Sequence, residues 1–271
     1  MATLSSNYYF PEVTLLITHY NRSSSIERLL SSFKELNCGF EEIIVSDDAS
    51  KPEHLDRLKL LQEQFNFRLI TTPVNGGLGN NINKGQDAVK TAYTIFVQDD
   101  FYPTSAFAEN FKQALEIMKQ ESQWDLIRFY SFPWNKYPYL KPYKNNFSEM
   151  VFKKMPWYSD YLKFFFYSDH PHLRRKNFLD KFGRYEEKQH VYVTEWRMCL
   201  SIIRKKAKGL YYDGSEVLFE HKNSEDEPAA QREKHWGENW RKKKNPAVLA
   251  LRAVYLKFRV IKNTFELIFS N

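Results

Sequence analysis

Two adjacent carboxylates follow an apolar run of the β type in the first half of the chain. Thr94–Val97 forms the run, Gln98 ends it, and Asp99 and Asp100 come next. The ligand crevice of a parallel α/β sheet opens at the carboxyl ends of its strands. The two carboxylates would therefore stand where a divalent metal and a phosphate can meet, which predicts phosphate-ester chemistry.

The elements that must position these carboxylates alternate regularly. Apolar runs predict four strands, at Val13–Thr18, Glu42–Ser46, Phe67–Ile70 and Thr94–Gln98. Between them, helical spacing of apolar residues covers 23–33 and 52–65, and the turn residues of Pro73–Gly79 precede a third helix through about residue 92. Such alternation predicts an α/β fold with a doubly wound, mostly parallel sheet and right-handed crossovers.

The second half of the chain is less regular. Residues 130–170 are rich in Tyr, Phe, Trp, Pro and Lys without a clean period, which predicts an irregular aromatic lobe beside the site. Around this lobe the pattern predicts a helix at 105–118, a strand at 125–129, a helix at Arg174–Phe182, an extended Val191–Thr194, a helix at Glu195–Lys205 and a strand at Val217–Glu220.

Four motifs resemble family 2 glycosyltransferases in order and spacing. They are Thr14–Arg22, Ile43–Ser50, Asn75–Gly77 with Asn83–Gly85, and Gln98–Asp100. The resemblance covers residues 13–103 strongly and 170–221 loosely, and it implies a fold of the nucleotide-diphospho-sugar transferase type, known as GT-A. Residues 1–130 would then be the nucleotide-sugar-binding half, 131–240 the acceptor-binding and catalytic-base half of the same domain, and 241–271 a basic amphipathic tail.

Asp48, which follows a strand end, indicates which nucleobase the sugar donor carries. A carboxylate there can accept a hydrogen bond from the imide N–H of uracil, a donor that cytosine lacks at that ring position, so a UDP-sugar is favoured. The resemblance implies donor contacts by Thr18, Tyr20, Asp47, Asp48, Gly77, Asn83 and Asp99. The alternative is that Asp47, Asp48 and Ser50 only form a turn and cap the next helix. Many relatives carry Arg before the Asn-x-Gly triplet, whereas this chain has Ile82.

The metal motif of the resembling family is Asp-x-Asp, and here its first position is Gln98. Asp100 aligns with the principal ligand, and His221 matches a further metal or diphosphate contact of some branches. Mn²⁺ or Mg²⁺ is commonly held by one or two protein carboxylates, with phosphates and waters filling the other positions. Bound there, it would neutralise charge on the departing diphosphate. The alternatives are a pair of exposed loop aspartates and a solvated histidine.

Glu195 is the candidate catalytic base. Transfer to a hydroxyl requires a base, because an alcohol is a poor nucleophile until its proton begins to leave. Glu195 follows Val191–Thr194 and loosely matches the Glu-Asp motif of the family, where a carboxylate acts as base in inverting transfer; here the second position is Trp196. The alternative is that Thr194 caps a helix whose dipole favours a glutamate in its first turn.

The net charge of +7 lies in the tail. Residues 241–271 hold eight basic side chains, four of them at Arg241–Lys244, against Glu266 alone, so the rest of the chain is balanced. From Pro246 to Phe269 basic and polar residues gather on one helical face, which predicts binding to an anionic membrane surface and a lipid-linked saccharide as one form of acceptor. The alternative is a helix packed on the body or on a second subunit. The balanced body has no basic groove, so no nucleic acid is expected.

The expected location is cytoplasmic, peripheral on the inner face of the plasma membrane, because no leader or spanning segment is visible in the sequence. Two competing functions remain open. A nucleotidyltransferase that makes activated sugars would show a glycine-rich loop with Arg and Lys straight after the first strand, unlike Thr18–Arg22. A non-catalytic membrane-binding module that retains the fold would bind donor weakly or not at all.

Overall fold

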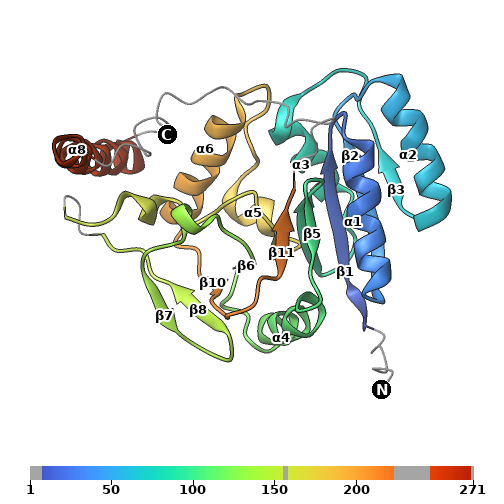
Figure 1. The fold of residues 1–271 in the computed structure, drawn as a ribbon, viewed down its shortest axis with the longest axis horizontal. Helices are drawn as coiled ribbons and strands as arrows, with labels where there is room; N and C mark the ends of the chain where they lie inside the picture. Colours follow the sequence, from blue (N-terminus) through green and yellow to red (C-terminus); the bar gives the residue numbers. More distant parts are fainter. Residues whose placement is uncertain (1–7, 155–157, 223–244, 270–271) are drawn as a thin grey trace.

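A nine-stranded sheet forms the centre of the computed structural model, which describes residues 8–154, 158–222 and 245–269 (Figure 1). The strand order is β3-β2-β1-β4-β9-β6-β10-β8-β7. The first four strands are parallel neighbours: β1 (Tyr8–His19), β2 (Cys38–Asp47), β3 (Arg68–Ile70) and β4 (Tyr93–Gln98). Their alternation with helices confirms the predicted α/β fold class.

The second half of the sheet is mixed. β9 (His172–Arg175) lies antiparallel between β4 and β6 (Leu126–Arg128), and β10 (Gly209–Tyr212) runs parallel to β6. The hairpin of β7 (Leu140–Pro142) and β8 (Phe147–Met150) forms the edge, and short 3₁₀ turns occur at η1 (Pro133–Asn135) and η2 (Tyr161–Phe164). The lobe predicted to be irregular thus extends the sheet.

The helix predicted at Arg174–Phe182 is wrong in its first half. Leu173 is fully buried, and Arg174 pairs with Thr94 of β4 and Leu126 of β6, so this segment completes two ladders at once. Only α5 (Phe178–Phe182) is helical. The demand of two neighbouring strands for backbone partners outweighs the local apolar spacing.

Helices cover both faces of the sheet, as the alternation of side chains along β1 requires. Leu15 and Ile17 pack with α1 (Ser23–Glu35), α2 (Pro52–Phe65) and α4 (Phe107–Gln120). Leu16 points to the opposite face and packs with α3 (Gly77–Asp87), α5 and α6 (Val191–Arg204). Cys38 and Cys199 lie in different clusters and are not bridged.

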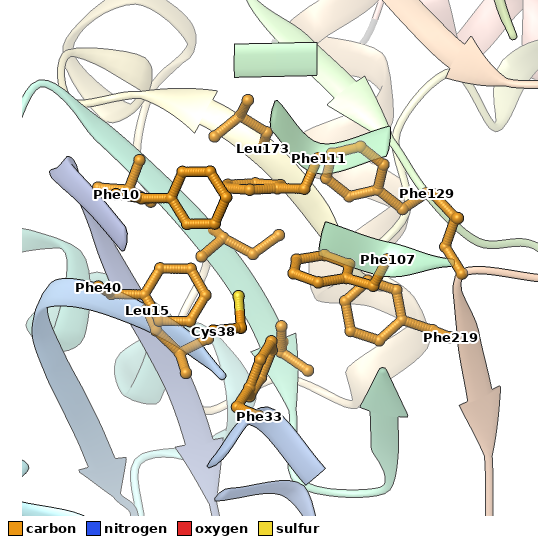
Figure 2. Packing of buried hydrophobic residues seen from close by; sticks show 14 of the residues in the cluster. Phe10, Leu15, Phe33, Cys38, Phe40, Phe107, Phe111, Phe129, Leu173 and Phe219 are labelled. Carbon is orange, nitrogen blue, oxygen red and sulfur yellow. The ribbon is translucent and has the colours of Figure 1, made fainter. Parts of the chain in front are cut away.

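Aromatic side chains dominate the first of these two cores (Figure 2). The Phe10 and Phe111 rings meet edge to face at 4.8 Å, and Phe107 meets Phe33 edge to face at 5.5 Å. Such pairs stabilise beyond the area that they bury, by about 0.5–1.5 kcal/mol each. They fix α1 and α4 against the sheet and thereby the loops that follow β1 and β4.

A separate two-stranded ribbon carries His221 to the aspartates. β5 (Phe101–Pro103) directly follows Asp100 and pairs antiparallel with β11 (Phe219–His221), with His221 opposite Phe101. The strand predicted at Val217–Glu220 is therefore displaced, because Val217 is exposed and precedes the ladder.

The segment Val191–Thr194, predicted to be extended, is instead the first turn of α6. The side chain of His190 accepts a hydrogen bond from the backbone N–H of Tyr192 at 3.2 Å and caps the helix. Thr194 is buried, and its hydroxyl donates to the carbonyl of Glu186 at 3.1 Å. The β-branched residues of this segment led to the prediction of an extended chain. Their preference for strands is weak, and helix capping and burial outweigh it.

Candidate active site

The carboxyl ends of β1, β2 and β4 open into a cleft of about 640 Å³, within the usual range for small-molecule sites. The start of α3 and the segment that begins α6 form its other walls. Seven of the residues predicted for the site line this cleft: Thr18, Tyr20, Asp48, Gly77, Asp99, Asp100 and Glu195. Residues more than a hundred positions apart are thus brought to one surface.

Asp48 holds the glycine loop. Its Oδ1 accepts the backbone N–H of Gly76 and its Oδ2 that of Gly77, both at 2.8 Å. Gly77 has a φ of +79°, in the left-handed region that favours glycine. Burial raises the pKa of the Asp48 carboxyl. Each oxygen keeps a second lone pair, so Asp48 can fix the loop and still accept a hydrogen bond from a ligand in the cleft.

Asp47 lies behind the cleft and is not part of its lining. Its Oδ1 lies 2.8 Å from Nδ1 of His19, and the hydroxyl and backbone N–H of Ser50 both donate to the carboxylate. Burial alone would raise the pKa of Asp47, but the hydrogen bonds from His19 and Ser50 outweigh it and lower the pKa. The structure therefore gives Asp47 the turn-forming position that was the alternative to donor contact.

Asn83 is also absent from the cleft lining. Its amide nitrogen donates to the carbonyl of Tyr185 at 2.9 Å, and its Oδ1 accepts the backbone N–H of Tyr185 at 3.0 Å. The same amide donates to Glu187 at 3.0 Å. Asn83 thus ties α3 to the segment that leads into α6 and supports two walls of the cleft from behind.

Arg22 is a residue of the cleft that sequence reasoning missed. Its Nη1 lies 2.8 Å from Asp99 Oδ1 and 3.2 Å from Asp100 Oδ2, so one guanidinium binds both carboxylates. Burial raises the pKa of Asp100, but His221 and Arg22 outweigh it and hold the pKa below its usual range. The signal was present in the motif Thr14–Arg22, which ends on a cation three residues after β1.

His221 stands beside Asp100 and does not belong to the cleft lining. Its Nε2 lies 3.2 Å from Asp100 Oδ2, and its ring packs against Phe101 at 5.0 Å and Phe132 at 5.2 Å. The structure thus brings the two residues predicted to hold a metal into direct contact, with His221 behind the carboxylate.

A divalent cation fits Asp100. Its Oδ1 is buried and has no hydrogen-bond partner among the described residues, while Oδ2 carries both Arg22 and His221. Mn²⁺ and Mg²⁺ prefer oxygen ligands and take several from phosphates and water. Among the described residues, no group of three or more His, Cys, Asp or Glu side chains is arranged to hold a metal ion. The carboxylate donor and its orphan oxygen suit an ion whose other ligands come from the substrate.

Glu195 lies on α6 directly after its first turn and is partly exposed to the cleft. Its Oε1 accepts the backbone N–H of Asp169 at 3.4 Å, and the hydroxyl of Ser168 also hydrogen-bonds the carboxylate. Burial raises the pKa of Glu195. A carboxylate held in place with a raised pKa is a better proton acceptor than a solvated one.

Asp169 is the second residue that sequence reasoning missed. It is buried, and its Oδ2 accepts the amide of Gln98 at 2.9 Å. Burial, followed by the charges of Glu195 and Asp100, raises the pKa of Asp169 well above its ordinary value. Asp169 comes from the stretch without periodicity, so only its position in space reveals the connection.

Known proteins share the sequence pattern and the fold of this chain. The sequence model described as Glycosyl transferase family 2 matches residues 14–183. The structure resembles S. aureus TarS 1-349 in complex with UDP-GlcNAc, with 15% identity, a TM-score of 0.62, and coverage of 96% of this chain and 73% of that chain. A longer S. aureus TarS structure is 16% identical with a TM-score of 0.56, over 79% of this chain and 37% of that one.

A third similar structure is the mannosyltransferase PcManGT from Pyrobaculum calidifontis in complex with GDP-Man and Mn²⁺. It is 12% identical, with a TM-score of 0.55, and the match covers 95% of this chain and 75% of that chain. No curated protein matches the sequence. At these identities the structural matches show the fold, while the family match spans more than half of the chain. The chain belongs to glycosyl transferase family 2 and is a glycosyltransferase of the GT-A type.

Proposed function

We propose that this glycosyltransferase moves a sugar from UDP to a hydroxyl of a saccharide, with inversion at the anomeric carbon and with a divalent metal. One observation carries the proposal: a single cleft joins the carboxylate of Glu195 to the cluster of Arg22, Asp99 and Asp100. The first can take a proton from an acceptor, and the second can hold a diphosphate.

Glu195 is the proposed base. In inverting transfer the acceptor oxygen attacks the anomeric carbon on the face opposite the leaving diphosphate, and its proton passes to a carboxylate. Hydrogen bonds from Asp169 and Ser168 hold Glu195 at the cleft, and burial raises its pKa towards the range where a base works best at neutral pH. Inversion needs no covalent intermediate on the protein.

Asp100 would hold the metal, and Arg22 would accompany it. When bound, the metal supplies Lewis acidity and neutralises charge on the departing diphosphate. Arg22 contributes a buried cation at the same wall. The guanidinium offers five N–H donors, and it supplies positive charge in a chain with Ile82 at the position where many relatives carry Arg.

Uridine is the proposed nucleoside. Asp48 and Thr18 line the cleft at the ends of adjacent strands, and Asp48 keeps lone pairs for an imide N–H. The GDP-Man in the similar PcManGT structure makes guanosine the second candidate, because N1 of guanine also carries an N–H beside a carbonyl. Cytidine has no such donor and should bind least.

Calorimetry separates these donors. The protein is titrated with UDP, GDP and CDP, each with and without Mn²⁺. We expect UDP to have the highest affinity of the three nucleotides, and we expect its affinity to be higher with Mn²⁺ than without it. Binding that is equal with and without Mn²⁺ would contradict the metal-dependent part, and tighter binding of GDP would replace the donor. The anomeric configuration of the product, measured by NMR, tests inversion.

A further inference from the structure

The helix α8 (Pro246–Phe269) contacts α6 and η2 (Figure 1). The indole N–H of Trp196 donates to Glu266 at 3.0 Å, and Arg204 donates to the carbonyls of Glu266 and Leu267, both at 2.8 Å. Val260 is 1% exposed and packs with Phe164 and Leu200. The side of α8 that carries Val260, Asn263 and Glu266 is therefore in contact with the rest of the protein.

The opposite side of α8, here named its outer face, is apolar and exposed. Nine of the sixteen exposed large hydrophobic side chains in the described part of the chain belong to α8. The outer face consists of Leu251, Val254, Phe258, Ile261, Phe265 and Phe269. Their spacing of three and four residues places them on one stripe of the helix, and exposure reaches 66% at Phe258 and 72% at Phe269. Monomeric proteins rarely leave such a stripe uncovered.

Lysines border this stripe. At 100° per residue, Lys257 and Lys262 fall on its two opposite edges. Lys257 donates to the carbonyl of Tyr158 at 3.2 Å, and Lys262 lies 3.5 Å from Glu266 on the same helix. Both side chains are exposed, and a lysine can place its stem along apolar surface while its ammonium reaches a polar layer.

We propose that the outer face of α8 inserts into the interface of an anionic lipid bilayer. The apolar stripe fits the acyl boundary, and the lysines on both edges fit the negative headgroups. A second copy of this chain is the less favourable occupant, because pairing two outer faces sets lysine edges against each other in either direction. Among the described helices, none is long and apolar enough to cross a bilayer.

From the sequence, the basic residues of this helix were expected to bind the membrane surface, and one of them does not face outward. The guanidinium of Arg259 donates to the hydroxyl of Tyr192 at 3.1 Å and lies 4.8 Å from the ring of Tyr161. The apolar stripe and the edge lysines make the contact in its place. The basic cluster Arg241–Lys244 lies outside the described residues, and the proposal does not depend on it.

The docked helix also fixes the cleft relative to the membrane. Tyr192, the partner of Arg259, lines the cleft, and Trp196 lies on α6 one position after Glu195. A bilayer bound to α8 would thus stand at a constant orientation to the proposed base. This step rests on the proposed function, and it makes a saccharide on a lipid carrier the favoured class of acceptor.

Vesicle sedimentation tests the proposal without any nucleotide. The full chain is mixed with vesicles of phosphatidylcholine alone or of phosphatidylcholine and phosphatidylglycerol in equal amounts. We expect sedimentation with the anionic vesicles, weakened by salt. Phe258→Ser with Phe265→Ser should weaken partition on the order of a hundredfold. Lys257→Gln with Lys262→Gln should weaken it about fivefold per lysine.

Leu60→Ser is the matched control, because Leu60 is an exposed apolar residue of α2 outside the outer face. It should leave sedimentation unchanged, and circular dichroism checks that every variant is folded. The proposal is overturned if the wild type stays in solution, or if the double phenylalanine variant sediments like it. It is also overturned if the wild type does not bind vesicles and ultracentrifugation shows that the wild type is a dimer while the double phenylalanine variant is a monomer. Failure of UDP binding would leave this result untouched.

Discussion

The side-chain amide of Gln98 donates to the carboxylate of Asp169 at 2.9 Å. This bond joins the end of β4 to the segment before β9, whose backbone N–H at Asp169 in turn donates to Glu195. An aspartate at position 98 would add a further negative charge beside Asp169 and Asp100. The uncharged Gln98 therefore adds no further negative charge to the interacting carboxylates of Asp169, Glu195 and Asp100.

The first prediction concerns the pH dependence of stability. The folded-state pKa of Asp169 is raised by burial and by the charges of Glu195 and Asp100. The contribution of protonated Asp169 to the free energy of unfolding is therefore complete at pH values below the pKa of this carboxyl in the unfolded chain. It is lost as the pH rises through the pKa of the carboxyl in the folded protein. Asp169→Asn cannot ionise, so its unfolding free energy should fall less between about pH 5 and about pH 8 than that of the wild type. Urea unfolding at both pH values measures this, and parallel curves would refute it.

Replacement of the proposed base should separate chemistry from binding. Glu195→Gln keeps the shape of the side chain but cannot accept the proton, so kcat should fall by about 10²–10⁴. The affinity for UDP with Mn²⁺ should stay within about twofold of the wild type, since the nucleotide is held elsewhere in the cleft. Steady-state kinetics and calorimetry check the two parts. Glu186→Gln is the control, because the carboxylate of Glu186 forms an ion pair with Arg197. This variant should keep the turnover of the wild type.

His221 should tune the metal through Asp100. His221→Ala removes the imidazole that lies 3.2 Å from Asp100 Oδ2, and partners of a ligand typically change metal affinity about 10–100-fold. We expect Mn²⁺ affinity in the presence of UDP to weaken by this amount. His221→Gln, which keeps a donor, should recover part of it. Unchanged Mn²⁺ affinity in the alanine variant would show that the contact has no such role.

Gly79 should be intolerant of a side chain. A Cβ built at Gly79 would lie 2.0 Å from the carbonyl oxygen of Glu186, so the segment leading into α6 must move. Gly79→Ala should cost about 1–3 kcal/mol of unfolding free energy and weaken UDP binding. Gly39→Ala is the comparison, because its nearest contact is the Tyr9 side chain at 3.3 Å. Equal stability losses in urea unfolding would remove the steric explanation.

The parallel half of the fold could be predicted from the sequence because its signals are local. Patterns within about a dozen residues suffice to predict each of its elements. Examples are the apolar run of β1, the amphipathic spacing of α1 and α2, and the glycine loop. β9 could not be read in this way. Its residues complete ladders with two strands that are distant in sequence, and that demand is invisible in the segment itself.

The site shows the same division. Asp99 and Asp100 were predicted from their place after a strand, and Glu195 from its place at the start of a predicted helix and its loose match to the family's Glu-Asp motif. All three line one cleft. Asp47 and Asp48 are neighbours in sequence, yet only Asp48 faces the cleft, because successive side chains at a strand end point to opposite sides. Asp169 was missed, since no periodic element announces it.

A crystal structure of the protein with UDP and Mn²⁺ would show whether Asp100 holds the metal against the diphosphate. We predict that the metal bonds to Oδ1 of Asp100 and to the diphosphate, with uracil beside Asp48 and with Glu195 open to the acceptor side of the same cleft. A diphosphate bound away from Asp100, or a metal held without this carboxylate, would contradict it.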